Sequence, residues 1–324
     1  MRLATIDNCT PDGALILVSP DAERCLYAGG TLQQAIERWN DAEPGLRALA
    51  ARLEHGEGEP LDHHRLLAPL PRAWQWLDGS AFPQHGELMQ QAFNLPPIET
   101  DRPLMYQGLS DRFLAGHADV PLPSEADGID FEGEYGVMTD FVPMGTTPEQ
   151  AMAHIRLVIL INDWSLRAIA PVEMKTGFGW VQAKPACSAA PFAVTPDALG
   201  DAWQDGRVHL PLHVTLNGQW FGHPHGGEMA FGFHELIAHA ARTRDLVAGT
   251  IIGSGTVSNA DYARVGSACI SERRAIEMIE TGTPQTDFLS FGSHVHMEAL
   301  GESGSPFGAI HQQVVQAGLP SYSQ

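Results

Sequence analysis

Cysteine is scarce in this sequence. The four cysteines among 324 residues, Cys9, Cys25, Cys187 and Cys269, lie far apart and form no Cys-x-x-Cys pair. They are too few for a disulfide framework and lack the spacing of a structural zinc site. Long apolar segments are missing too, since the longest purely aliphatic run is residues 157–161 and a membrane span needs about 20 apolar residues. These absences exclude a disulfide-rich module and a membrane-spanning protein.

Basic residues are also few. The chain has 19 Lys and Arg residues against 39 Asp and Glu residues, a formal net charge of −20. So acidic a chain disfavours nucleic acid and anionic membranes as partners. The first seven residues hold no long apolar segment of the kind that directs export, and 44% hydrophobic residues is ordinary for a globular protein. The composition indicates a globular enzyme or binding protein of the cytoplasm.

Two domains are expected, a small N-terminal one over residues 1–70 and a larger one over residues 71–324. In the first, apolar residues repeat at helical spacing from Leu32 to Trp39, behind Thr31, which can cap the helix. Strands are expected near residues 3–6 and 14–19, and the polar, glycine-rich residues 54–60 are expected to form a loop.

The larger domain is predicted to be rich in strands. Residues 129–137 and 208–216 alternate between apolar and other side chains, which is typical of strands. The second segment runs into Asn217-Gly218, a hairpin signal, and its Pro211 suggests a strand at the edge of a sheet. Helical patterns are few and do not alternate regularly with the strands. We therefore expect a β-rich α+β fold.

Acidic residues are the first indication of chemistry. Glu132 and Glu134 are two apart in an expected strand, so both side chains lie on one face, with β-carbons roughly 7 Å apart. Asp163 follows the apolar run 157–161, and Asp78 lies in an Asp-Gly pair that would ordinarily be a turn. The alternative interpretation of Glu132 and Glu134 is a solvated strand face, and that of Asp163 is a helix cap. If these oxygens converge, they suit a hard cation such as Mg²⁺, Mn²⁺ or Ca²⁺ rather than zinc.

At these residues the sequence resembles the fumarylacetoacetate hydrolase family. The matching motifs occur in order between about residue 70 and residue 300. They are Asp78 with His85 seven residues later, Met105-Tyr106-Gln107-Gly108, Asp130-Phe131-Glu132-Gly133-Glu134, Asn162-Asp163-Trp164-Ser165-Leu166-Arg167, Gln182-Ala183-Lys184-Pro185, Gly249-Thr250-Ile251-Ile252-Gly253-Ser254-Gly255-Thr256, and Glu272.

The resemblance implies a fold and a set of site residues. The fold is a mixed β-sheet roll preceded by a small β-rich N-terminal domain, usually in a homodimer. A divalent metal is implied, with Mg²⁺ favoured and Ca²⁺ or Mn²⁺ also suitable. By this likeness His85 is a general base that Glu272 orients, and Lys184 stabilises negative charge on the substrate. The implied metal ligands are Asp78, Glu132, Glu134 and Asp163, and the implied substrate contacts are Tyr106 and Thr256.

The activity implied is hydrolysis of the carbon–carbon bond of fumarylacetoacetate or a related acylpyruvate, a diketo acid of aromatic amino-acid and tyrosine breakdown. Decarboxylation, hydration or tautomerisation of a 2-oxo acid such as oxaloacetate at the same site is the alternative, and a non-catalytic metal-binding protein is a third. Asn94, Ala170 and Met174 stand where the animal hydrolases have substrate-contacting residues. The sequence therefore leaves the acyl group open.

Two other features are interpreted as structural. Gly253-Ser254-Gly255 lacks the Gly-x-Ser-x-Gly pattern of a nucleophilic serine, so its glycines are expected to permit close backbone approach. Cys187 has no evident base beside it and is expected to be a small buried residue.

Overall fold

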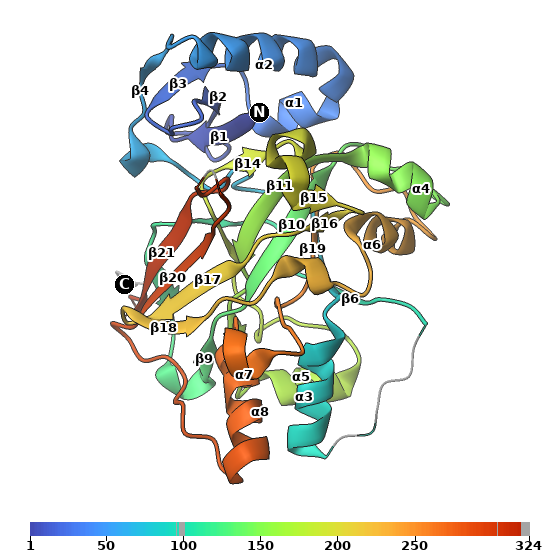
Figure 1. Cartoon of the computed structure of the whole chain (residues 1–324), viewed down its shortest axis with the longest axis vertical. Helices are drawn as coiled ribbons and strands as arrows, with labels where there is room; N and C mark the ends of the chain where they lie inside the picture. The colour runs from blue at the N-terminus through green and yellow to red at the C-terminus, as the bar shows by residue number, and fades with distance from the viewer. Residues whose placement is uncertain (95, 97–100, 303, 319–324) are drawn as a thin grey trace, which may run out of the picture.

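The computed structural model describes residues 1–94, 96, 101–302 and 304–318, and most of its strands belong to one large mixed sheet (Figure 1). Strands from the beginning and the middle of the chain make up this sheet. In chain order they are β1 (Arg2–Ile6), β2 (Ala14–Val18), β3 (Arg24–Tyr27), β4 (Glu59–Pro60), β5 (Gln75–Ser80), β6 (Leu104–Gln107), β7 (Leu114–Ala115), β10 (Gly133–Thr139), β11 (Ile155–Asn162), β13 (Ser188–Ala189), β14 (Ala193–Val194) and β19 (Thr250–Gly253).

A second sheet and two short strand pairs complete the β structure of the described residues. The second sheet contains β8 (Val120–Leu122), β17 (Leu212–Leu216), β18 (Gln219–Gly222), β20 (His294–Ala299) and β21 (Ala309–Gln316). The pairs are β9 (Ile129–Asp130) with β12 (Ser165–Leu166), and β15 (Trp203–Gln204) with β16 (Arg207–Val208).

The helices gather at the two ends and one side of the sheets (Figure 1). They are α1 (Leu32–Glu37), α2 (Trp39–Glu54), α3 (Pro83–Phe93), α4 (Pro148–Ala151), α5 (Ala170–Thr176), α6 (Phe233–Ala240), α7 (Tyr262–Val265) and α8 (Ile270–Thr281). Short 3₁₀ helices cover His63–Arg65, Glu125–Asp127, Met152–His154, Pro196–Ala202 and Gly226–Glu228. The β-rich α+β fold with mixed sheets is thus confirmed.

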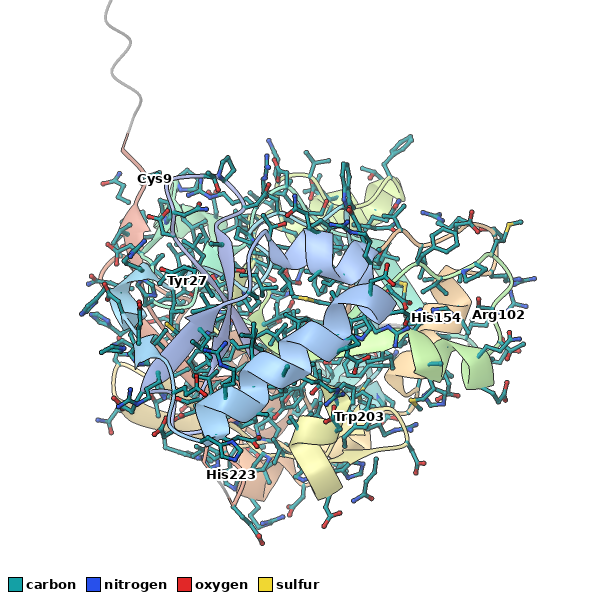
Figure 2. The ribbon with its side chains drawn as sticks, turned by 90° about the horizontal axis from the view of Figure 1, so that it is seen from above. Cys9, Tyr27, Arg102, His154, Trp203 and His223 are labelled. Atoms are coloured by element: carbon teal, nitrogen blue, oxygen red, sulfur yellow. The ribbon has the colours of Figure 1, made fainter. Side chains whose placement is uncertain are left out.

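The N-terminal elements form largely as the sequence predicts. Both early strands are present, and Thr31 caps α1 with a capping box that it shares with Gln34. The helix ends sooner than expected, because the backbone leaves the helical conformation at Arg38 and Trp39 begins α2. Seen from above in Figure 2, α1 and α2 lie across the N-terminal strands. Their apolar faces cover a core that includes Leu17 and Leu46.

The N-terminal strands extend the same sheet that carries the larger domain. The path of the large sheet is β4-β3-β2-β1-β14-β11-β10-β19-β5-β6, and β1 pairs with β14 through Arg2 opposite Val194 and Leu3 opposite Ala193. A backbone ladder therefore joins the two parts of the chain. The division at residue 70 stays a prediction.

The edge position predicted from Pro211 is wrong. The segment 208–216 splits at Pro211, so that Val208 ends β16 and Leu212 begins β17. β17 lies between β18 and β20 within the second sheet, and β18 is at the edge. The proline precedes β17 and therefore removes no hydrogen bond from its ladder.

The strand predicted over residues 129–137 is also interrupted. β9 ends at Asp130 and β10 begins at Gly133. Between them, Glu132 forms an isolated bridge with Cys269, just before α8. This local change of partner gives Glu132 and Glu134 different surroundings.

Candidate metal and catalytic site

Three buried carboxylates, each on a strand or directly after one, meet in the large sheet. Glu134 lies on β10, Asp78 on β5, and Asp163 directly after β11. One oxygen from each of these side chains lies within 4.8 Å of the others. The exposed fraction is 5% for Asp78 and 0% for Glu134 and Asp163. Carboxylates that were distant in the sequence therefore converge on one point inside the protein.

The strand between β10 and β5 must carry no side chain at the position beside Asp78 for this convergence. In β19, Gly253 pairs with Asp78 on one side and with Gly136 of β10 on the other. A β-carbon on Gly253 would lie 2.5 Å from Oδ1 of Asp78. The amide of Gly255, whose φ is +75°, donates to the same oxygen at 3.1 Å. The close backbone approach predicted at these glycines is confirmed.

The electrostatics of the three carboxylates favour a cation. Burial, followed by the charge of Asp163, raises the pKa of Asp78 to about 8. Burial, followed by the charge of Asp78, raises the pKa of Glu134 well above its ordinary value. Among the residues that the structure describes, neither oxygen of Glu134 has a hydrogen-bond partner. Buried carboxylates repel one another unless they are protonated or bound to a cation, so this oxygen set fits a hard divalent ion.

Glu132 lies to one side of that set. Its Oε1 pairs with Arg167 at 2.6 Å, and its Oε2 pairs with Lys184 and accepts a hydrogen bond from Ser165 at 3.2 Å. Burial by itself would raise the pKa of Glu132, but Arg167 and Lys184 outweigh it and hold the pKa well below its ordinary value. Glu132 is therefore charged and satisfied, unlike Glu134.

Lys184 joins Glu132 to the three-carboxylate cluster. Its Nζ pairs with Glu132, lies 2.5 Å from Oδ2 of Asp163 and donates to Ser165 at 2.8 Å. Burial disfavours an ammonium group, but Asp163 and Glu132 outweigh that cost and raise the pKa of Lys184. The hydroxyl of Tyr106 donates to the same oxygen of Asp163 at 2.5 Å. A fixed positive charge therefore stands next to the candidate metal ligands.

His85 and Glu272 come together from two helices. His85 is in the first turn of α3 and Glu272 in the first turn of α8, and Nδ1 of His85 lies 2.9 Å from Oε2 of Glu272. The side chain of Glu272 is fully buried, whereas that of His85 is 19% exposed. Leu88, Ala275 and Ile276 form the apolar contact that holds these helices together. Because this contact engages Nδ1, the other ring nitrogen, Nε2, is the one that could take a proton.

The structure gives the remaining predicted residues the following positions. Thr256 is buried and follows β19 by three residues. Ala170 begins α5, and Met174, in the same helix, is 65% exposed. Asn94 ends α3 in the left-handed conformation, with φ at 50°, which asparagine adopts more readily than most residues. Cys187 is buried as predicted, and its Sγ lies 3.0 Å from Asp163.

Asp130 and Arg167 were not predicted as site residues from the sequence. Asp130 is fully buried and accepts hydrogen bonds from the amides of Ile270 and Ser271, the first residues of α8. Arg167 bridges Asp130 at 2.8 Å and Glu132 at 2.6 Å. Asp130 and Arg167 each lie inside one of the motifs that resemble the family. The signal in the sequence was therefore an acidic residue in one motif and a basic residue in another. They connect the helix that carries Glu272 to the buried carboxylates.

Known proteins resemble this chain in sequence and in fold. In curated sequences, the chain is 27% identical over 163 residues to 2,4-didehydro-3-deoxy-L-rhamnonate hydrolase of Sphingomonas sp. (strain SKA58), a match covering 49% of this chain and 54% of that protein. It is 25% identical over 231 residues to the mitochondrial oxaloacetate tautomerase Fahd2a of Rattus norvegicus, covering 70% of this chain and 68% of that one. The chain thus spans about half the length of the first relative.

Solved structures show the same fold at low identity. A putative HpcE protein from Mycobacterium smegmatis superposes with a TM-score of 0.72 and 18% identity, over 98% of this chain and 100% of that one. Maleylpyruvate hydrolase from Sphingobium sp. SYK-6, solved with manganese(II) and pyruvate, superposes with a TM-score of 0.66 and 15% identity, over the same shares.

Sequence profiles identify the family. The profile of the fumarylacetoacetase N-terminal domain 2 matches residues 1–72. The profile of the fumarylacetoacetate hydrolase C-terminal domain matches residues 75–315, which hold all the site residues described above. The chain belongs to the fumarylacetoacetate hydrolase family, whose members include hydrolases and tautomerases.

Proposed function

We propose that this chain is a divalent-metal-dependent hydrolase that cleaves the carbon–carbon bond of fumarylacetoacetate or a shorter acylpyruvate. The observation that carries the proposal is the pairing of His85 with Glu272 at 2.9 Å, next to buried carboxylates that fit a cation. Hydrolysis needs a base that activates water, whereas decarboxylation does not. A positioned histidine–carboxylate pair supplies such a base.

The metal would be held by Asp78, Glu134 and Asp163, with Glu132 as the fourth ligand that the family resemblance implies. Mg²⁺ is the proposed ion, and Mn²⁺ and Ca²⁺ also suit an all-oxygen site. A bound divalent ion would supply Lewis-acid polarisation of the two substrate oxygens. The manganese in the maleylpyruvate hydrolase structure supports a divalent ion in this fold.

His85 is proposed to start the reaction by taking a proton from water. The water oxygen then bonds to one carbonyl carbon of the diketo acid, and the carbon–carbon bond breaks so that its electron pair passes to the other fragment as an enolate. His85 returns its proton to the carbon of that enolate, which balances the reaction. Glu272 fixes the tautomer of His85 and stabilises its charged form.

Lys184 and the residues around it are proposed to hold the substrate. The ammonium of Lys184, pinned between Glu132 and Asp163, would stabilise the negative charge that develops on oxygen. Tyr106 donates to Asp163 and, with Thr256, is proposed to contact the substrate. The exposed Met174 on α5 offers no polar group to a distal carboxylate, which favours a short acyl chain.

The test is a substrate panel. Purified chain with Mg²⁺ should remove the ultraviolet absorbance of fumarylacetoacetate or an acylpyruvate, and EDTA should stop the reaction. Several acylpyruvates of increasing length, run with one metal, would identify the acyl group. Absence of turnover on the whole panel by metal-loaded protein would refute the hydrolase.

Tautomerisation, decarboxylation or hydration of a 2-oxo acid is the second candidate. It is favoured by the 25% identity to an oxaloacetate tautomerase over 70% of this chain. The same histidine could move a proton between carbon and solvent without adding water. This second candidate would be supported, and the hydrolase refuted, if the protein rapidly removes the enol or the carboxyl group of oxaloacetate but cleaves no diketo acid.

We further propose that the protein is a homodimer that acts in the breakdown of aromatic compounds, as its family resemblance implies, and that it is cytoplasmic, as its composition indicates. None of the helices in the described part of the chain is long and apolar enough to cross a membrane. Sedimentation equilibrium should give twice the chain mass of 35.1 kDa. A single-chain mass would refute the dimer.

A further inference from the structure

A second group of potential metal ligands lies beside the carboxylate cluster. It consists of His85, Glu132 and Cys269, which offer a ring nitrogen, a carboxylate oxygen and a thiol sulfur within 4.8 Å of one another. These donors differ in kind from the all-oxygen set of Asp78, Glu134 and Asp163, and Glu132, the fourth ligand implied there by the family resemblance, would be common to both sites. Sulfur and imidazole ligands select zinc-like ions, whereas oxygen ligands select magnesium and calcium.

The fold holds each member of this group in place independently of any ion. The backbone bridge between Glu132 and Cys269 brings those two residues together. Sγ of Cys269 caps α8 by accepting a hydrogen bond from the amide of Glu272 at 3.3 Å. Glu272 in turn holds Nδ1 of His85 at 2.9 Å. A carboxylate on one ring nitrogen is the usual way in which proteins orient a metal-binding histidine.

We propose that His85, Glu132 and Cys269 form a second metal site, which binds thiophilic divalent ions such as Zn²⁺ or Cd²⁺ and thereby inhibits the enzyme. The inhibitory part rests on the proposed function, because a metal on His85 occupies the nitrogen lone pair that would take the proton of water. When the ion binds, the thiol of Cys269 releases its proton to solvent and a metal–sulfur bond forms. No oxidation or reduction occurs.

An ion can reach this site from solvent at His85. The side chain of His85 is 19% exposed, whereas Cys269 is fully buried and Glu132 is 5% exposed. The histidine therefore forms the outer wall of the site and the cysteine its floor. Three protein ligands, with the fourth position left to a water or a substrate atom, are the arrangement of an open zinc site.

Direct binding is tested with Cd²⁺ and the full chain in saturating Mg²⁺. Magnesium occupies the oxygen site, and a Cys9→Ser background removes the exposed thiol that would also bind cadmium. We expect one equivalent of Cd²⁺ to give an ultraviolet sulfur-to-cadmium charge-transfer band. No band at any cadmium concentration that leaves the protein folded would overturn the proposal.

Two matched variants locate the sulfur ligand. Cys269→Ser keeps a side chain that can cap α8, and it should lose the band and weaken cadmium binding at least about tenfold, given that even indirect metal partners contribute about 10- to 100-fold. Cys187→Ser alters the buried thiol beside Asp163 and should keep the band. A band that survives in Cys269→Ser, or that disappears in Cys187→Ser, would overturn the assignment. Thermal unfolding shows that each variant is folded.

The activity measurement separates this site from the proposed function. In the same background, Zn²⁺ should inhibit turnover, and Cys269→Ser should raise the inhibitory zinc concentration at least about tenfold when compared with its own zinc-free rate. Equal inhibition of both proteins would overturn the regulatory role. If no substrate is turned over, the proposed function fails, while the charge-transfer band still decides whether the second site exists.

Discussion

His85 links the two halves of the site, because it faces Glu272 from one helix and shares a ligand group with Glu132. If it is the base, His85→Ala should lower kcat by roughly 10²- to 10⁴-fold and leave the fold intact. His55→Ala, which alters an exposed histidine at the end of α2, is the control and should keep the wild-type rate. Steady-state rates on the best panel substrate give the answer, and an unchanged rate in His85→Ala would remove that residue from its role.

Asp78 should make the ion-free protein less stable as the pH rises. Its folded pKa is about 8 against an ordinary 3.8, so the folded state binds more protons than the unfolded state between these values. The free energy of unfolding should therefore fall as pH rises through this window, by up to about 1.4 kcal/mol per pH unit from this group. Asp78→Asn cannot take part in this titration.

The comparison is made by urea unfolding in EDTA at several pH values within that window. As pH rises, the free energy of unfolding of wild type should fall relative to that of Asp78→Asn. Parallel curves for the two proteins would show that Asp78 is not held protonated by its neighbours.

At the scale of elements, β19 works as a spacer between two acidic strands. Gly253→Ala would place a β-carbon 2.3 Å from the ring of Trp76 and 2.5 Å from Asp78. We expect the variant to lose at least about 1–3 kcal/mol of stability through overpacking and to bind Mg²⁺ more weakly. Gly45→Ala, in the open middle of α2, is the matched control and should be neutral or stabilising by up to about 1 kcal/mol. Equal magnesium affinity in both variants would contradict the spacer role.

The first turn of α8 depends on Asp130. This carboxylate caps the amides of Ile270 and Ser271 and pairs with Arg167. Asp130→Asn removes the charge and leaves Arg167 with a single partner, so we expect a loss of about 3 kcal/mol or more in stability. Loss of this cap should also displace Glu272, and so lower kcat and shift the pH profile of kcat.

Asp119→Asn, at an exposed aspartate, controls for the loss of one negative charge. If Asp130→Asn loses stability but keeps the wild-type pH profile of kcat, then Asp130 supports the fold without positioning the His85–Glu272 pair.

The same elements show what the sequence could and could not predict. The apolar run 157–161 and the cap at Thr31 are local signals, and both were interpreted correctly. The edge strand at Pro211 and the unbroken strand through Glu132 were predicted wrongly, because both depend on which distant segment pairs there. β20 lies beside β17, and Cys269 lies beside Glu132. The meeting of Asp78 with Glu134 could come only from the family resemblance, since spacing cannot show that β19 separates their strands.

At the scale of the whole molecule, a bound ion should stabilise the fold. An ion at 100 times its Kd would add about 2.7 kcal/mol to the free energy of unfolding, so Mg²⁺ should raise the unfolding temperature and EDTA should lower it again. Glu134→Gln should abolish most of this rise, because it removes a ligand from the buried set. Glu280→Gln, at an exposed position of α8, should keep it. An equal rise in both variants would place the ion elsewhere.

The ladder between β1 and β14 has a consequence for anyone who divides this protein. Arg2 and Leu3 pair with Val194 and Ala193 in an antiparallel ladder. Cutting the chain after its first 70 residues would remove β1 and leave the backbone amide and carbonyl groups of β14 unpaired at a sheet edge, beside an apolar surface. Such an edge invites self-association. Truncated forms should therefore precipitate, whereas the two parts of the chain expressed together should re-form the pairing of β1 with β14 and stay in solution.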